Sequence, residues 1–426
     1  MLKWFREYRS DPWVKRNFLC NTADGALYAF AMSCISLTVV LPVFVREIGG
    51  SNVAVGLIPI FWTLGFNFPQ ILVANYSGRF PFKKVLLLRT ALGQRLPWLL
   101  LSVLSFFVIS KVSRSTGLML FFFCFVLAAI AGSINLPGWF DLVAKLTPVK
   151  LRGRLFASRI ILGALLGILG GWLVKAVLGR YSYPNNFSLL FLTAFIVMMV
   201  SYVFQVFLKE DKADIQKRNL GLTEFFRLLP GILKNERNYR NFLIADALLI
   251  IALMAEVFYG LNALSRFSLA DSYVGNFTII YMSFSIVGNM FFGYMADRFG
   301  HKLNMFLAAS FTAMASLAAL FASDVTTYSL AFIGSAFTAG LYQLSKLPII
   351  AELCAEENRP TYVALSNMVT SPFSLAGLLG GWIANVYGYN MVFILACIFA
   401  GSSALWLLFA VKEPRKSAVA EQAEKA

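Results

Sequence analysis

A single acidic residue, Glu256, lies in the middle of the long apolar run 241–264. In a helix it would stand about 24 Å from Arg240, just before the run, and about 15 Å from Arg266, just after it, at about 1.5 Å per residue. A charge at such depth in a bilayer costs roughly 2.5–3.5 kcal/mol on insertion scales. Glu256 is therefore interpreted as a protonatable group or as a ligand for a cationic group. The alternative is a carboxylate paired with another helix for packing alone.

Arg95 is a second charge inside an apolar run, in a segment made polar and bent by Gln94 and Pro97. A guanidinium there could bind an anionic substrate group through two parallel hydrogen bonds. It could equally neutralise Asp24 or Asp141. The sequence leaves these two roles open.

Lys346 is a third charge at membrane depth, on the helical face of Tyr342 and close to that of Gln343. The corresponding position in the first half of the chain holds the uncharged Asn135, so the internal repeat does not require a charge there. Contact with a substrate is one reading of Lys346. Snorkelling of its ammonium to the nearby membrane surface is the other.

Asp24 and Asp246 occupy similar places in the two halves, each following an Arg-Asn-Phe-Leu sequence. Such symmetry favours a role in gating over a role in substrate binding, and Arg159 is expected to belong to the same polar network. Asp24 is nevertheless the second candidate, after Glu256, for a carboxyl group that binds and releases a proton.

Composition identifies the elements that must position these residues. The chain has 426 residues, of which 59% are hydrophobic and 14% charged. A water-soluble protein of this length could not hide so much apolar surface, so the sequence predicts an all-α membrane protein. Twelve apolar stretches are long enough to span a bilayer, at roughly 22–46, 53–76, 86–110, 117–144, 155–177, 187–208, 241–264, 272–295, 303–323, 327–350, 361–386 and 389–411.

The basic residues set the expected orientation. Most of the 37 lysines and arginines fall in the two tails and in the loops that follow even-numbered spans. This bias predicts a multi-pass protein of the cell membrane with both termini in the cytoplasm. The net charge of +16 is then explained by topology and by contact with anionic lipid. Because the basic residues are scattered over short loops, nucleic acid is not expected as a partner.

The sequence also repeats itself. Arg79 and Lys83 recur 219 residues later as Arg298 and Lys302. A fixed-offset repeat in an apolar chain predicts two bundles of like topology with a cleft between them. We therefore divide the chain into a six-helix bundle with an interfacial N-terminal segment (1–208), a cytoplasmic linker with an amphipathic helix (209–240), a second six-helix bundle (241–412) and a cytoplasmic tail (413–426).

Small residues gather at matched places in the two halves. Residues 167–172 read Gly-Ile-Leu-Gly-Gly-Trp, and residues 377–382 read Gly-Leu-Leu-Gly-Gly-Trp. Glycines at this spacing let helix backbones approach closely, and the tryptophan anchors the outer interface. Val55-Gly56 and Val274-Gly275 form a further matched pair. We expect close helix packing from the two glycine blocks rather than a role specific to antiport.

The loop after the eighth span carries Gly293, Asp297, Arg298, Gly300 and Lys302 in the order G-x-x-x-D-R-x-G-x-K. With twelve spans, a 6+6 repeat and a charged central loop, this motif resembles the major facilitator superfamily (MFS) over essentially the whole chain. The resemblance implies the MFS fold of two pseudo-symmetric six-helix bundles, with helices 1, 4, 7 and 10 lining a central cavity. It also implies that the loop motif helps to hold one access state.

Acids and arginines at matched helix ends add to this expected cytoplasmic gate. Carboxylate–arginine pairs can close a protein face and can break when two bundles rock apart. Besides the five motif residues, the gate is predicted to contain Arg79, Lys83, Asp141, Arg152, Glu352 and Arg359.

Together with the resemblance, these residues predict a secondary active transporter that moves a small organic solute by alternating access. Protons are the favoured coupling ion, with Glu256 as the first coupling residue and Asp24 as the second. The alternatives are a multidrug or lipophile exporter, an uncoupled facilitator, and a transporter-like sensor or assembly factor. The candidate substrate cavity contains Arg95, Glu256, Tyr342, Gln343, Lys346, Trp62 and Asn67.

The charges in that candidate cavity, two cations and one deep acid, favour a small anionic or zwitterionic solute with an apolar portion. The sequence shows no nucleotide-binding glycine loop and no nucleophile–base arrangement, which argues against a primary pump and against an enzyme. The five cysteines lack metal-ligand spacing. We expect no cofactor, no metal, and a monomer surrounded by membrane lipids.

Overall fold

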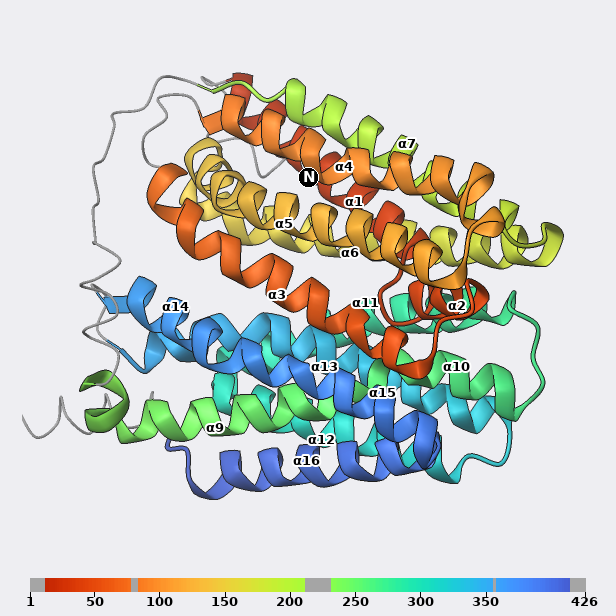
Figure 1. Cartoon of the computed structure of the whole chain (residues 1–426). Coiled ribbons are helices and arrows are strands. Elements are labelled where there is room, and N and C mark those ends of the chain that lie inside the picture. Colours follow the sequence, from red (N-terminus) through yellow and green to blue (C-terminus); the bar gives the residue numbers. More distant parts are fainter. Residues whose placement is uncertain (1–11, 78–82, 211–230, 355–357, 414–426) are drawn as a thin grey trace, which may run out of the picture. The chain divides into compact units, whose positions relative to one another are not determined.

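The computed structural model describes residues 12–77, 83–210, 231–354 and 358–413, and these parts of the chain are helical with short connections (Figure 1). The first half contains α1 (Pro12–Cys34), α2 (Val40–Glu47), α3 (Asn52–Ser77), α4 (Lys83–Phe107), α5 (Arg114–Leu146), α6 (Val149–Arg180) and α7 (Asn185–Val206). The predicted linker helix falls largely on residues outside the described ranges.

The second half repeats this pattern. It contains α9 (Arg237–Ala252), α10 (Glu256–Arg266), α11 (Tyr273–Phe299), α12 (His301–Phe321), α13 (Val325–Glu352), α14 (Arg359–Thr370), α15 (Ala376–Val386) and α16 (Tyr389–Phe409), with 3-10 turns at Leu253–Ala255 and Ser371–Leu375. Within the described residues, nine helices are long and apolar enough to cross a membrane. The remaining three predicted spans correspond to α1 with α2, to α3 and to α13.

The helices group into two compact units. Unit 1 comprises Met1–Gly50, Phe61–Asn219 and Ala270–Ser283; unit 2 comprises Ser51–Ile60, Leu220–Leu269 and Phe284–Ala426. The first turns of α3 therefore belong to unit 2, and the first turns of α11 belong to unit 1.

The first predicted span, 22–46, differs from the structure at both ends. Its helix already begins at Pro12 and stops at Cys34, and a second helix runs over Val40–Glu47. Pro12 can start a helix because its missing N–H would be unpaired in the first turn. Pro42 lies in the first turn of α2 for the same reason, and it cannot bond back to the preceding turn. A continuous helix through residues 35–42 is thereby prevented.

Two later spans are interrupted within the membrane. In the eleventh, Pro372 lies inside the 3-10 turn Ser371–Leu375, and its missing N–H accounts for the break. In the seventh, the 3-10 turn Leu253–Ala255 ends immediately before Glu256, although its sequence contains no glycine or proline. Short 3-10 stretches within helices often mark functional hinges or strain. The interruption therefore singles out the position of Glu256.

The glycine blocks pack closely, as predicted. In unit 1, a Cβ added to Gly171 would lie 3.1 Å from the carbonyl oxygen of Gly275. In unit 2, a Cβ on Gly377 would lie 2.6 Å from the carbonyl oxygen of Gly56. Backbones at this separation leave no room for a side chain. The contacts explain why the α6–α11 and α3–α15 crossings use glycine.

Candidate functional site

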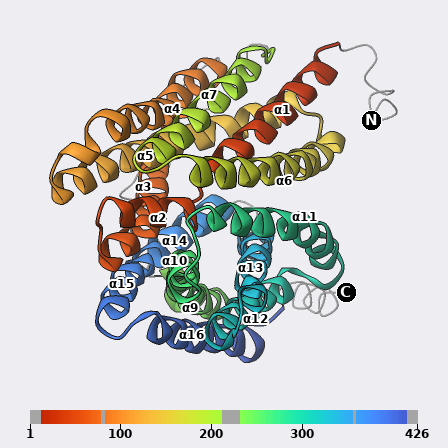
Figure 2. The same cartoon turned by 90° about the vertical axis from the view of Figure 1, so that its right-hand side faces the viewer.

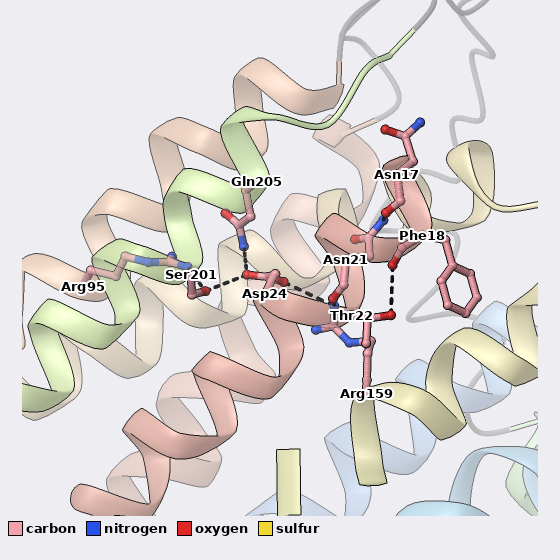
Figure 3. Close-up of polar contacts among 9 residues, drawn as sticks. All are labelled: Asn17, Phe18, Asn21, Thr22, Asp24, Arg95, Arg159, Ser201 and Gln205. Atoms are coloured by element: carbon pink, nitrogen blue, oxygen red, sulfur yellow. Dashed lines mark hydrogen bonds and ion pairs between the residues drawn. The ribbon is translucent and has the colours of Figure 1, made fainter. Parts of the chain in front are cut away.

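Asp24 of α1 is a buried carboxylate with three side-chain partners (Figure 3). Its Oδ1 accepts hydrogen bonds from Ser201 Oγ at 2.7 Å and from Gln205 Nε2 at 2.9 Å, both on α7. Its Oδ2 lies 3.3 Å from Nη1 of Arg159 on α6. A buried charge needs a counter-charge and hydrogen bonds, and Asp24 has both.

Arg159 is held in place by more than this ion pair. Its Nη1 also donates to the carbonyl oxygen of Asn21, and its guanidinium lies 4.7 Å from the centre of the Trp139 ring. The guanidinium occupies the space that a side chain at Gly25 would need, with Cζ only 2.5 Å from the position of such a Cβ. The glycine next to Asp24 therefore makes room for the arginine.

Arg95 on α4 belongs to the same network rather than standing free. Its side chain is 1% exposed. Its Nε donates to the Met198 carbonyl at 2.8 Å, its Nη1 to the Ala91 carbonyl at 2.9 Å, and its Nη2 to Ser201 Oγ at 3.4 Å. Because Ser201 also donates to Asp24, the structure favours the second role open to Arg95, that of a counter-charge near Asp24 (Figure 3).

A cavity of about 280 Å³ opens beside this network within unit 1. Its walls combine aromatic rings, amides and the Asp24–Arg159 pair. The lining residues are Asp24, Tyr28, Met32, Trp62, Phe66, Gln94, Arg95, Gly132, Asn135, Leu136, Trp139, Arg159 and Gln205. Ligand sites are typically apolar clefts with a few placed polar groups, and this cavity has that character.

The amides of the cavity differ in how fully they are bonded. Gln94 Nε2 donates to Tyr28 Oη at 2.7 Å, and Asn135 Oδ1 accepts from Thr90 Oγ1 at 2.9 Å. Gln205, 4% exposed, has no partner for its Oε1 among the described residues. An unpaired buried acceptor of this kind is costly. A solute that offers an O–H or N–H group to Gln205 would satisfy it.

The sequence prediction placed only part of this cavity. Trp62 does line it, stacked on Phe66 with ring centres 5.7 Å apart. Asn67, on the next turn, is not among its lining residues. The sequence analysis did not include Ser201 and Gln205. Two polar residues one helical turn apart in an apolar span could have indicated a buried polar contact on that face.

Lys346 of unit 2 forms an internal ion pair. Its Nζ lies 3.0 Å from Oδ2 of the fully buried Asp246 on α9 and donates to Tyr342 Oη at 2.7 Å. The ammonium is thus directed to an inner carboxylate and not to the membrane surface, where one of the two interpretations from sequence placed it. Gln343, on the same helix, is exposed. The pair gives unit 2 a counterpart of the Asp24–Arg159 pair in unit 1.

Glu256 is the first residue of α10 and is partly buried. No cation of the described part of unit 2 lies within ion-pair distance of it. The polar groups that the sequence placed nearby bond to other partners. Tyr259 Oη pairs with Ser316 Oγ at 2.9 Å, and Asn262 Oδ1 accepts from Tyr328 Oη at 2.9 Å.

The loop motif of the predicted gate has clear local roles in unit 2. Gly300 adopts a φ of +92° before α12, and a Cβ there would lie 2.6 Å from a carboxylate oxygen of Glu413. Lys302 Nζ donates to the Leu408 carbonyl at 3.2 Å, near the end of α16. Arg298 donates to Tyr294 Oη at 3.2 Å. Gly293 and the exposed Asp297 lie on the last turns of α11.

The other predicted gate residues make contacts that the sequence did not suggest. Arg152 donates to the carbonyls of Thr147 at 3.1 Å and Ala144 at 2.6 Å, so it caps the end of α5. Glu352 Oε1 lies 3.9 Å from Nε2 of His301. Asp141 and Arg359 lie at the ends of α5 and α14, while Arg79 and the side chain of Lys83 fall outside the described parts of the chain.

Comparison with known proteins agrees with this architecture. Residues 247–426 match the family model described as Major Facilitator Superfamily. No curated protein matches the sequence. The fold resembles that of the nucleoside transporter NupG at 12% identity, with a TM-score of 0.73 over 93% of this chain and 100% of that one.

Two other solved transporters are similar. A D-xylose–proton symporter shares 15% identity, with a TM-score of 0.69 over 94% of this chain and 99% of that chain. A POT family transporter in complex with a thioalcohol-conjugated peptide shares 10% identity, with a TM-score of 0.69 over 92% and 95%. The family match is thus confined to residues 247–426, while the fold of the described chain is that of these solved transporters. With its many long apolar helices, the chain is a multi-pass membrane protein.

Proposed function

We propose that the protein is a secondary active transporter that binds a small organic solute in the cavity of unit 1 and couples its movement to protons. The observation that carries this proposal is the buried Asp24–Arg159 pair, which borders a cavity with aromatic and amide walls. A buried ion pair at a ligand cavity links the charge state of a carboxylate to the occupancy of the cavity. The nucleoside transporter and the xylose–proton symporter of like fold are consistent with a small polar solute.

The cavity favours a solute with one flat or apolar face and hydrogen-bonding groups. Trp62 and Trp139 supply aromatic surface, and Gln205 supplies an open acceptor. The charge argument for an anion counted Arg95 and Lys346 as available cations, and both have internal partners. We therefore propose an uncharged or zwitterionic solute, and an anion becomes an outcome of the test. The volume of about 280 Å³ suits a molecule smaller than most drugs.

Glu256 and Asp24 are the proposed proton-binding groups. Glu256 leads because it has no cation partner in the described part of unit 2 and follows a 3-10 interruption of its helix. Asp24 is second because protonation would weaken its hold on Arg159 beside the cavity. The two residues lie in different units, so each is tested by itself.

A thermal-shift screen of metabolites and drugs on detergent-purified protein tests the binding part of the proposal. A ligand stabilises by about 2.7 kcal/mol at a hundredfold excess over Kd. Trp62→Ala and Gln205→Leu should each remove the shift caused by a small polar solute. Trp172→Ala is the matched control, because Trp172 lies in the same unit and is 57% exposed.

If only cationic lipophiles shift the melting temperature, and the cavity variants leave that shift intact, drug export is the better account. If only organic anions shift the melting temperature, the substrate is an anion, as the count of charges in the sequence favoured. A protein that binds solutes but catalyses no flux would point to a sensor.

A further inference from the structure

A groove of about 950 Å³ runs between the start of α9 and the end of α16 in unit 2. The two helices lie side by side in both views of the molecule (Figures 1 and 2). The groove holds three basic side chains, Arg237, Arg240 and Lys412, and no acid is among its described lining residues.

The side chains of two of these cations are open to a ligand. Arg237 and Lys412 are exposed, and neither side chain has a hydrogen bond or ion pair within the described residues. Arg240 Nη1 donates to the Leu233 carbonyl at 3.0 Å, which leaves its other N–H groups. Glu413, which follows Lys412, places its carboxylate against Gly300 instead, and Glu236, which precedes Arg237, is not among the described lining residues. The positive charge of the groove is therefore not neutralised from within.

The groove continues into an apolar strip on α16. Leu405 is 58% exposed, Trp406 39% and Phe409 81%. Aromatic residues beside basic ones at the end of a membrane helix are typical of the lipid headgroup region. A molecule that fits both parts must carry a negative charge at one end and hydrocarbon at the other.

Backbone contacts fix the walls of the groove. Asn238 Nδ2 donates to the Lys412 carbonyl at 3.1 Å, and the Lys412 amide donates back to Asn238 Oδ1 at 2.8 Å. Asn241 Nδ2 donates to the Ala410 carbonyl at 2.8 Å. These bonds join α9 to the end of α16, so the backbone that carries the basic side chains is held in place before any ligand arrives.

The first half of the chain has the same kind of asparagine–backbone contact. Asn17 exchanges two hydrogen bonds with the backbone of Lys209, at 3.0 and 2.9 Å. There, however, the cations lie against aromatic rings. Arg16 lies 5.2 Å from the centre of Trp13 and 5.8 Å from that of Phe207, and Lys209 lies 5.2 Å from Trp13. The basic side chains at the two matched ends therefore differ in what they contact.

We propose that this groove binds one anionic phospholipid. Its phosphate would lie between Arg237 and Lys412, and its acyl chains would follow Trp406 and Phe409. Basic pockets between membrane helices bind anionic headgroups in this way. The site does not depend on the transported solute, so its failure and the failure of the proposed function can be distinguished.

Native mass spectrometry of the full chain in detergent, titrated with phosphatidylglycerol or phosphatidylcholine, tests the proposal. The protein should retain one phosphatidylglycerol in preference to phosphatidylcholine. The double variant Arg237→Gln/Lys412→Gln should weaken that binding about 30-fold, since each basic residue contributes about 1 kcal/mol. Lys15→Gln/Lys209→Gln removes the same charge from the matched end of the first half and should leave the binding unchanged.

Two further measurements test the apolar strip and the basic residues of the site separately. Trp406→Ala should weaken phosphatidylglycerol binding while the charges remain, and inorganic phosphate alone should not compete at equal concentration. The proposal is overturned if both lipids bind alike, or if the groove variant binds phosphatidylglycerol as the unmodified protein does. Competition by inorganic phosphate would also overturn it, because the site would then recognise a free anion.

Discussion

Asp24 and Arg159 form an ion pair across α1 and α6, and the same carboxylate is hydrogen-bonded to α7 through Ser201 and Gln205. One buried side chain thus joins three helices at the edge of a cavity (Figure 3). Lys346 and Asp246 make the corresponding pair in unit 2, at 3.0 Å.

The Asp24–Arg159 pair should show strong coupling. Removing one partner of a buried pair costs about 3–5 kcal/mol, because the other charge stays buried without compensation. Asp24→Asn and Arg159→Met should each destabilise the protein, whereas the double variant should lose much less than the sum. Thermal unfolding of the four proteins measures this. Strictly additive losses would show that the two side chains do not interact.

Asp246 should depend on its cation more than Asp24 does. In Lys346→Met the Asp246 carboxylate is left with no cation in the described part of unit 2, whereas in Arg159→Met Asp24 keeps its bonds to Ser201 and Gln205. We expect Lys346→Met to lower the melting temperature further than Arg159→Met does. Lys346→Arg, which keeps the charge, should recover part of the loss. Equal melting temperatures for Lys346→Met and Arg159→Met would contradict this reasoning.

Replacing glycine by alanine should have opposite effects inside and outside the close contact between α3 and α15. Gly56→Ala puts a Cβ against the Gly377 carbonyl oxygen and should destabilise by about 1–3 kcal/mol, as overpacking does. Gly401→Ala on α16 meets no atom within 4 Å and should be neutral or stabilising by up to about 1 kcal/mol. Chemical unfolding compares the two. A neutral Gly56→Ala would mean that the helices separate without cost.

The dependence of stability on pH in mild acid should come in part from two carboxyl groups of unit 1, Glu47 at the end of α2 and Asp271 just before α11. Burial raises the pKa of Asp271 although Arg46 opposes this, and burial together with the charge of Asp271 raises the pKa of Glu47. A raised carboxyl pKa in the folded state stabilises the fold below the ordinary carboxyl pKa, and this contribution is lost as pH rises through the raised value. The melting temperature should fall over that window, and Asp271→Asn should flatten the fall. An unchanged slope in the variant would exclude Asp271 as its source.

The sequence predicted the fold because its signals are strong and redundant. Long apolar runs located all twelve spans to within a few residues at most ends, and paired glycine blocks located two close helix crossings. The breaks were harder to predict. Pro42 and Pro372 could have indicated two of them. The third, at Leu253–Ala255, has no proline or glycine that would predict it.

The site was predicted less well, for a physical reason. Depth in the membrane can be read from position along a helix, so Glu256, Arg95 and Lys346 stood out. Which groups meet across helices depends on rotation and packing, which one sequence does not reveal. The sequence consequently left two roles open for Arg95 and for Lys346, and in the structure both side chains have internal partners.

Transport in proteoliposomes under an imposed pH gradient tests the central claim most directly, with a solute identified by thermal shift. The account predicts that the gradient drives accumulation by the unmodified protein and that Glu256→Gln abolishes this response while solute exchange without a gradient persists. Gradient-driven accumulation that survives in Glu256→Gln but not in Asp24→Asn would move the coupling role to Asp24. Flux that ignores the gradient in every variant would contradict proton coupling and leave an uncoupled facilitator.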